Sequence, residues 1–326
     1  MRPYRVRITP KSAFGTPLKG DTLFGQICWA ARNQYGVERL ESLLEKYTAG
    51  LPFVVVSDAF PADHLPRPAL PGHWFDEITG ADRKAAKKRI WLPVEHYQSP
   101  VAGWLAHLRP ARDVLGAAPE ERPQPHNTLN RETGTTSKGE FAPYAMSQLW
   151  YGQKQIDRKR AIPEVLLDLY FVLDEERMKH DELQTLLGAI GKIGYGRDAS
   201  IGLGKFEVKA FEPFDLPKHD DANAWLTLAP CAPQGLAWDE TCCFYQPFTR
   251  FGRHGDAGAH SGNPFKTPVL LADTGAVLTP VQFEKRAFAG QGLGGDGSLS
   301  KAVPETVHQG YAPIAAIRLP EQGGRQ

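Results

Sequence analysis

The sequence is short of the features that assign a protein to a class at a glance. Its four cysteines include an adjacent pair, Cys242 and Cys243, and none has C-x-x-C spacing, so we expect reduced structural thiols and no zinc or other metal site. The net charge is only +1, which excludes attraction of polyanions by a general basic field and requires any nucleic-acid site to be local. The sequence contains no run of eighteen apolar residues, the length needed to span a bilayer, and its first residues lack the apolar stretch of a signal peptide. We therefore expect a cytoplasmic protein.

Catalytic signatures are equally scarce. The ten histidines are scattered without metal-ligand spacing, and no nucleophile-elbow pattern is present, although a triad assembled from distant residues would leave no such local pattern. A single histidine in such a setting is typical of an ordinary surface or core position. The sequence therefore predicts neither a catalytic residue nor a cofactor.

What the chain does contain is a regular alternation of strand and helix patterns. Alternating apolar and basic residues at 4–8 indicate a half-buried strand, and an apolar face at 21–36 indicates a helix that Asp21 or Thr22 can cap. The same reasoning predicts four further elements: strands at 51–60, 164–174 and 206–210, and a helix at 180–194.

This order, β-α-β and then β-α-β after an insertion, is that of a split ferredoxin-like domain, whose helices cover one face of an antiparallel sheet. The last strand would pair with the first. That pairing would leave four basic residues on the uncovered face: Arg5, Arg7, Lys205 and Lys209. An RNA-recognition domain carries stacking aromatic residues there, so we do not expect bases to stack on this sheet.

Two stretches depart from the alternation. Residues 61–160 combine prolines, charge runs and polar turns without a sustained period, and we expect a long insertion of irregular structure. From about residue 220, short strands and glycines replace helices, and "ADTGAV" is a plausible hairpin turn. The predicted fold class is therefore α+β with two ferredoxin-like (RRM-like) domains. The first, 1–215, carries the insertion, and the second, 216–326, is degenerate and mainly β.

Two polar motifs are candidates for binding. "IGYGRDASIGLGKFEV" at 193–208 is a glycine-dense loop whose N–H groups could form a concave anion site, or which could simply be a flexible connection into a strand. "HNTLNRETGTTSKGEF" at 126–141 suits a long polar hairpin whose donors could meet phosphates or ribose hydroxyls, or a solvated surface loop. The basic runs at 83–89 and 154–160 are more typical of solvated faces.

Five motifs, in this order along the chain, carry a resemblance to a known family: "PLKGDTLFGQICWAARNQYG", "PFVVVSDAFP", "HNTLNRETGTT", "GYGRDASIGLGKFEV" and "HQGYAPI". Together they resemble the RAMP superfamily of CRISPR proteins. Within it, the chain is most similar to the family of fourth subunits of type III-A (Csm) effector complexes. The "DTLFG" helix start and the glycine loop contribute most to the resemblance.

The resemblance implies two ferredoxin-like folds, no catalytic role and no cofactor. It implies that the chain holds the 5′ repeat-derived handle of the CRISPR RNA, docks the large palm-domain subunit and the first backbone subunit, and meets target RNA only indirectly. Three groups of RNA-binding residues follow from it. They are Gly194, Gly196, Arg197, Ser200, Gly202, Gly204 and Lys205 in the glycine loop, Asn127, Asn130, Arg131 and Lys138 in a thumb-like hairpin, and Lys19, Gly20, Asp21 and Thr22 at a helix start.

A helix start also suits a phosphate independently of the resemblance. One alternative is a metal-independent endoribonuclease of the same superfamily, with a histidine as general acid or base. Another is a purely structural interaction protein, which would need no basic loop. Since the helix before the glycine loop carries no His–Lys pair suited to RNA cleavage, we favour RNA binding without catalysis.

Overall fold

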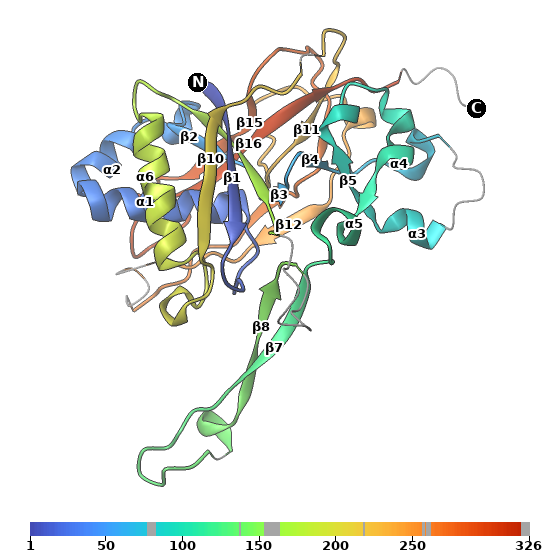
Figure 1. Ribbon diagram of the computed structural model, residues 1–326. Helices are drawn as coiled ribbons and strands as arrows, with labels where there is room; N and C mark the ends of the chain where they lie inside the picture. Colours follow the sequence, from blue (N-terminus) through green and yellow to red (C-terminus); the bar gives the residue numbers. More distant parts are fainter. Residues whose placement is uncertain are drawn as a thin grey trace.

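The structure is a computed structural model that describes residues 1–76, 83–136, 138–152, 164–217, 219–255, 258 and 262–320. Two β-rich halves form one body, and a two-stranded hairpin projects away from it (Figure 1). Among the described residues, no helix combines the length and the apolar character needed to cross a bilayer.

The first half is built on an antiparallel sheet with the strand order β10-β1-β9-β2. Its strands are β1 (Arg2–Pro10), β2 (Val54–Val56), β9 (Leu167–Leu173) and β10 (Phe206–Pro213), and β3 (Phe60–Pro61) also pairs with β9. The pairing of first and last strands expected from the sequence is confirmed, for example at Ile8 and Val208. All four strand segments expected in this half are present.

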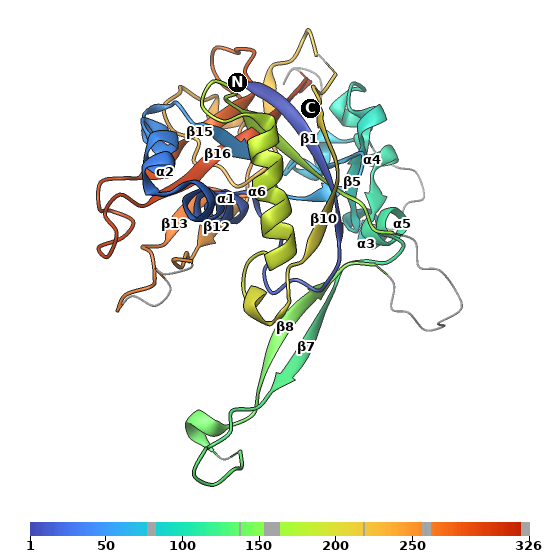
Figure 2. The ribbon, with the colours of Figure 1, turned by 60° about the vertical axis from the view of Figure 1, so that its left-hand side comes forward.

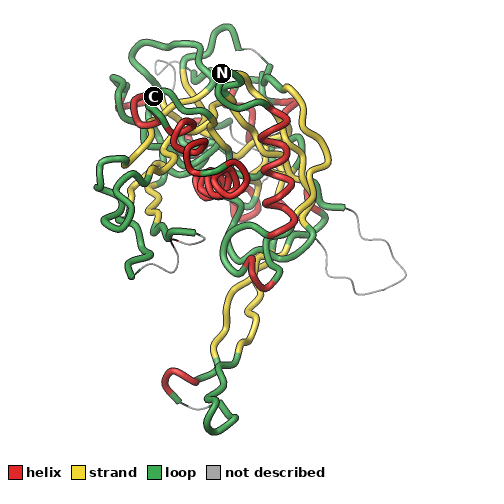
Figure 3. The backbone as a smooth tube through the Cα atoms, turned by 90° about the vertical axis from the view of Figure 1, so that its left-hand side faces the viewer, coloured by secondary structure: helices red, strands yellow, loops and turns green. Residues whose placement is uncertain are grey.

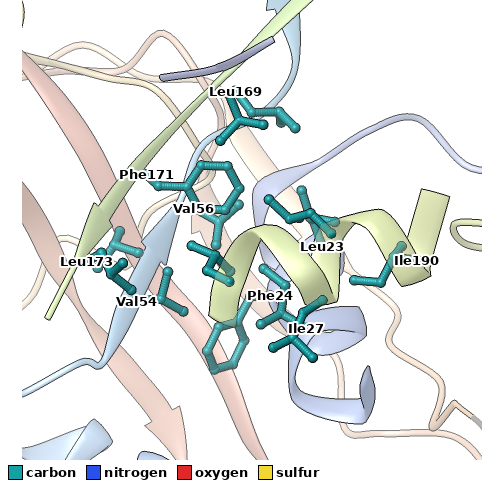
Figure 4. Close-up of a cluster of buried hydrophobic side chains, with 14 of the residues drawn as sticks. Leu23, Phe24, Ile27, Val54, Val56, Leu169, Phe171, Leu173 and Ile190 are labelled. Atoms are coloured by element: carbon teal, nitrogen blue, oxygen red, sulfur yellow. The ribbon is translucent and has the colours of Figure 1, made fainter. Parts of the chain in front are cut away.

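Helices α1 (Gly20–Tyr35) and α6 (His180–Ile193) cover one face of this sheet (Figure 2). Their apolar faces meet the sheet in the main core, where Leu23, Phe24 and Ile27 of α1 lie close to Val56 and Phe171 (Figure 4). A helix that the sequence analysis did not identify, α2 (Val37–Leu44), follows α1 after Gly36, whose φ of +91° suits glycine.

The other face of the sheet is not bare, which corrects the expectation of an uncovered basic face. Tyr170 packs there with Leu226 and Ile317 of the second half. Arg5 pairs with Asp63 at 2.8 Å and Arg7 with Asp168 at 2.7 Å, while Lys209 pairs with acidic groups at 3.0 and 3.1 Å. The basic residues are thus largely neutralised by carboxylates that the sequence pattern did not pair with them.

The insertion is not irregular, and that prediction is wrong. It holds a three-stranded sheet of β4 (His64–Pro66), β5 (Arg89–Pro93) and β6 (Arg109–Pro110), with short helices α3 (Arg83–Lys87), α4 (Trp104–His107) and α5 (Ala111–Leu115). Trp104 and Leu92 are fully buried in a second core that the insertion shares with the second half. Elements this short contain too few residues for a period to show.

The second half is mainly β in its described residues, as expected. One sheet has the order β14-β11-β16-β15, formed by β11 (Ala224–Thr227), β14 (Val277–Leu278), β15 (Phe288–Gly294) and β16 (Val307–Ile317). A separate ribbon pairs β12 (Pro247–Arg250) with β13 (Val269–Ala272). "ADTGAV" is not a hairpin turn, because β13 pairs with β12 and β14 pairs with β11, so the turn carries the chain between two sheets.

The two halves are joined through buried polar contacts as well as through shared cores. The side-chain amide of Gln309 in β16 donates to the carbonyl of Val56 at 2.8 Å and accepts from its N–H at 2.9 Å. This contact satisfies both backbone hydrogen-bonding groups of Val56 at the edge of β2. The expected boundary at residue 215 falls between β10 and β11, and the division into two domains stays a prediction.

The projecting hairpin is formed by β7 (Glu120–His126) and β8 (Tyr144–Trp150), paired from Glu120↔Trp150 to His126↔Tyr144 (Figure 3). The motif at 126–141 therefore forms mainly the loop at its end rather than its two arms. Seven single-turn 3-10 helices complete the described chain: Tyr47–Ala49, Gly72–Trp74, Val94–His96, Val101–Gly103, Gly139–Phe141, Ala199–Ile201 and Glu240–Cys242.

Candidate nucleic-acid interface

The glycine loop, residues 194–205, connects α6 to β10 through backbone conformations that favour glycine. Gly194, Gly196, Gly202 and Gly204 have φ values of +121°, +76°, +96° and +71°. A Cβ at Gly204 would lie 2.0 Å from the carbonyl oxygen of Tyr195, so no side chain fits there. At Gly202 the space is open and only the positive φ selects glycine.

This loop is packed rather than loosely connecting. The N–H of Gly204 donates to the carbonyl of Ala13 at 2.7 Å, and the N–H of Arg197 donates to Thr16 Oγ1 at 3.1 Å. The Tyr195 ring is fully buried, and its hydroxyl donates to the carbonyl of Pro17 at 2.9 Å. The glycine loop therefore braces residues 11–19, the segment that leads from β1 into α1.

The same loop contacts the base of the hairpin. Arg197 Nη2 donates to the carbonyl of Ser147 in β8 at 2.6 Å. Beside it, Phe14 and Leu149 exchange backbone hydrogen bonds of 2.9 and 2.8 Å. Three segments that lie far apart in the sequence thus meet: the glycine loop, the 11–19 segment and strand β8 form one hydrogen-bonded unit, which we name the loop–hairpin junction.

The surface of the junction combines polar and apolar groups. Arg197, Ser200 and Lys205 are exposed, and Arg197 Nε lies 3.3 Å from the neighbouring Asp198 carboxylate. Ile193 and Ile201 are 70% and 62% exposed, and the sequence analysis did not select them. The available signal was weak: Ile193 ends the helix outside the stripe that Leu183, Leu186 and Ile190 form.

The remaining hairpin candidates lie away from the junction. Asn127, Asn130 and Arg131 follow β7, and Lys138 precedes β8, so all four belong to the end loop. From Ser147, which Arg197 contacts, three residues of β8 lead to Tyr144 beside that loop, which is about 10 Å at the usual rise per residue. Asn130 shapes the loop itself, since its side chain accepts from the N–H of Glu132 at 2.8 Å.

The N-terminus of α1 already binds a carboxylate of the same chain, that of Asp58. The N–H of Gly20 donates to Asp58 Oδ1 at 2.8 Å, and Lys19 Nζ lies 2.9 Å from Asp58 and 2.8 Å from Asp273. Burial raises the pKa of Asp58, while Lys19 opposes that shift. The Asp58 carboxylate therefore occupies the position where a phosphate was expected, and phosphate binding by Lys19 and Gly20 stays a prediction.

Asp21 must be removed from the set of RNA-facing side chains. Its side chain has no exposed surface, and its carboxylate accepts hydrogen bonds from Arg250 Nε at 2.6 Å and Nη2 at 2.8 Å. His308 Nε2 lies 3.4 Å away. Although burial would raise the pKa of Asp21, the adjacent His308 and Arg250 side chains hold it well below its usual range. Thr22 is partly buried, and its N–H donates to Asp21 Oδ1 at 2.8 Å.

Metal and thiol chemistry is not indicated by the described part of the chain. It holds no cluster of three or more His, Cys, Asp or Glu side chains arranged to bind a metal ion. All four cysteines are free thiols, and burial raises the pKa of Cys28 and of Cys231 to about 12, which disfavours the reactive thiolate.

Comparison with solved structures identifies the fold. No family model matches the chain, and no curated protein matches it. A chain in the crystal structure of the Csm1–Csm4 cassette in complex with pppApA matches 98% of this chain and 100% of its own length, with 14% identity and a TM-score of 0.58. A chain in the crystal structure of the Csm3–Csm4 subcomplex of the type III-A CRISPR–Cas interference complex covers the same shares, with 13% identity and a TM-score of 0.58.

The chain thus has the α+β fold of a chain found in type III-A CRISPR–Cas assemblies. The subunit common to the two assemblies is Csm4, and the chain shares the Csm4 fold over nearly its whole length. The resemblance inferred from the five motifs is confirmed at the level of the fold.

Proposed function

We propose that the chain is a non-catalytic CRISPR RNA-binding subunit of a type III-A effector complex, built on two ferredoxin-like domains. The loop–hairpin junction is the observation that carries this proposal. It presents the exposed Arg197, Ser200 and Lys205 on one short loop, which contacts the projecting hairpin through Arg197. Cations and hydroxyls on a rigid backbone are the groups that position an RNA phosphate chain.

The 5′ handle of the RNA would lie on the junction, with its phosphates near Arg197 and Lys205. Exposed Ile193 and Ile201 would pack against sugar or base surfaces beside them. The end loop of the hairpin would contact the RNA farther along, through Asn127, Asn130, Arg131 and Lys138. Lys19 would support the RNA site without contacting RNA through its ammonium group, because that group pairs with Asp58 and the Lys19 N–H donates to Tyr195 Oη of the glycine loop.

The partners follow from the neighbouring structures. Their Csm4 chains are found with Csm1 in one assembly and with Csm3 in the other. We propose that this chain likewise docks a large palm-domain subunit and a backbone RAMP subunit, and meets target RNA only through them. No histidine occurs between residues 194 and 205, which favours RNA binding over an endoribonuclease centred on this loop.

The test is photo-crosslinking in the assembled complex. The chain is co-purified with its partner subunits and a CRISPR RNA that carries 4-thiouridine in the handle, and crosslinked peptides are identified by mass spectrometry. We expect crosslinks to residues 193–205 and intact RNA after incubation with the chain alone. Handle crosslinks confined to other subunits would refute RNA binding here, and specific cleavage of repeat RNA would support the endoribonuclease.

A further inference from the structure

The ribbon of β12 and β13 continues beyond the ends of its two strands. The N–H of Lys266 donates to the carbonyl of Gly252 at 2.9 Å, and Arg253 forms an antiparallel bridge with Phe265. The two segments therefore stay paired as they leave the strands and do not open into a loose loop at these positions. We name these paired segments, residues 247–254 and 264–272, the extended ribbon.

The inner face of the extended ribbon is fixed to the rest of the molecule. Arg250 donates to the buried carboxylate of Asp21, so the ribbon lies beside α1 (Figure 2). His254 is buried as well, and its Nε2 lies 2.8 Å from Ser300 Oγ. Successive side chains of a strand point to opposite faces, so the residues between these two anchors point away from α1 and from the 11–19 segment that leads into it.

The opposite, outer face exposes large apolar side chains. Phe251 is 77% exposed, Leu270 is 70% exposed and Phe265 is 66% exposed. Directly paired residues project from the same face, so Phe265 shares the face of Arg253. Leu270 shares the face of Thr249 for the same reason. The outer face extends about 20 Å along the first segment at the usual rise per residue. Its described residues are Pro247, Thr249, Phe251, Arg253, Phe265 and Leu270.

The composition of the outer face fits a protein partner better than RNA. Single exposed apolar residues are ordinary, but a contiguous apolar strip marks an interaction surface. Protein interfaces are enriched in aromatic residues and arginine and depleted in Lys, Asp and Glu, and the six residues of this face follow that pattern. A surface for single-stranded RNA carries several cations beside its aromatic rings, whereas Arg253 is the single charged residue among these six.

Charge and position also distinguish between protein partners. A second copy of the chain would meet the outer face with the same six residues, which offer Arg253 no carboxylate. A backbone subunit that follows the RNA would lie against the loop–hairpin junction, and the outer face points away from the 11–19 segment of that junction. The large palm-domain subunit is the partner that remains.

We propose that the outer face of the extended ribbon docks the large palm-domain subunit, on an apolar surface of that subunit that contains a carboxylate for Arg253. Phe251 and Phe265 would be the buried anchors of this interface, because aromatic side chains commonly carry most of the binding energy. The inference rests on the proposed function, since it locates one of the two dockings proposed there.

The test is the affinity of the full chain for the purified large subunit, measured by biolayer interferometry. Phe251→Ser and Phe265→Ser should each lower this affinity at least about tenfold, the loss expected for an anchor residue. Leu270→Ser should lower it as well. The matched control is Leu51→Ser, a leucine of the first half that is 58% exposed, which should leave the affinity unchanged. The thermal midpoints should stay within a few degrees of wild type, because all four side chains are exposed.

Charge variants of Arg253 test the carboxylate. Arg253→Glu should weaken binding of the large subunit more than Arg253→Met, because charge reversal adds repulsion to the loss of an ion pair. Equal effects of the two variants would refute a carboxylate opposite Arg253. The RNA content of the assembled complex and its affinity for the backbone subunit should not change in either variant.

Unchanged affinity for the large subunit in the double variant, Phe251→Ser with Phe265→Ser, would overturn the proposal. A loss confined to the backbone subunit, to RNA or to self-association of the chain would also overturn it and would assign the face to that occupant. If handle crosslinks form but the double variant keeps the large subunit, this inference fails and the proposed RNA binding stands. A wild-type chain that does not bind the large subunit would refute the proposed docking as well.

Discussion

Arg250 donates hydrogen bonds of 2.6 and 2.8 Å to the carboxylate of Asp21, across 229 positions of sequence. Asp21 lies in the first turn of α1 and Arg250 at the end of β12, so this ion pair joins the two halves of the molecule. The segment that leads into α1 is also the one that the glycine loop braces. A buried contact between the halves therefore supports the surface proposed for RNA.

Replacement of Arg250 by alanine should destabilise the protein strongly. The variant leaves the Asp21 carboxylate buried without its main partner, which typically costs about 3–5 kcal/mol. Urea denaturation measures this loss. The control is Arg112→Ala, which removes an arginine whose side chain is 77% exposed and should cost less than about 0.5 kcal/mol. Equal losses in the two variants would contradict a structural role for the buried pair.

The Asp21–Arg250 ion pair also makes the free energy of unfolding depend on pH in acidic solution. The pKa of Asp21 is lower in the folded protein than in the unfolded chain, so the unfolded state takes up a proton first as the pH falls. The stabilisation that the Asp21 carboxylate gives the folded protein is complete above the unfolded pKa of about 3.9 and is lost progressively below it. Denaturation at a series of pH values should show the stability gap between wild type and Asp21→Asn narrowing below about pH 4. A gap that stays constant would exclude this linkage.

Two variants of the glycine loop should lower CRISPR RNA retention in the purified complex. Arg197→Ala removes the proposed phosphate donor and the contact with Ser147, and Gly202→Val places a branched side chain at a φ of +96°. The control is Gly188→Ala in α6, where a Cβ meets nothing within 4 Å. Retention should also weaken with salt in the wild type, since each neutralised phosphate releases counterions. RNA content equal to wild type in both loop variants would remove the junction from the RNA site.

The exposed lysines of the insertion should act on assembly rather than on RNA. Lys87 ends α3 and Lys88 follows it, and neither belongs to the loop–hairpin junction. We expect Lys87→Glu with Lys88→Glu to change subunit content or solubility while handle binding per assembled complex is unchanged. Size-exclusion chromatography and RNA quantification measure the two effects separately. Loss of the handle from an intact complex would reverse this assignment. The second basic run, at 154–160, lies outside the described residues.

Shortening the hairpin end should change the RNA footprint without unfolding the chain. The described residues of the segment, Thr133 to Thr136, are all exposed, and the three hydrophobic cores contain none of them. Deletion from Thr133 to Ser137 should therefore leave the thermal midpoint within a few degrees. Nuclease accessibility of the RNA next to the handle should increase if the hairpin wedges between nucleotides. Identical footprints in the assembled complex would indicate a solvated loop.

Much of the first sheet could be predicted because its elements are long enough to show a period. The pattern of Tyr4, Val6 and Ile8 reports a strand with one buried face, and the apolar stripe of α6 reports a helix. The insertion shows no such period, because its residues in the second core, such as Leu92 and Trp104, come from elements of only five and four residues. No period can be read from such segments.

The sequence alone determined the order of the long strands and helices of the first sheet, the need for glycine in the loop and the absence of a general basic field. Only the tertiary structure decided which charges are available. Lys19 and Asp21, adjacent to a helix start and predicted to face RNA, are held by Asp58, Asp273 and Arg250 from distant segments. A period reveals which face of an element is buried, because burial repeats with the backbone geometry. It does not reveal which element covers that face, since the partner of a charge is fixed by packing between segments hundreds of residues apart.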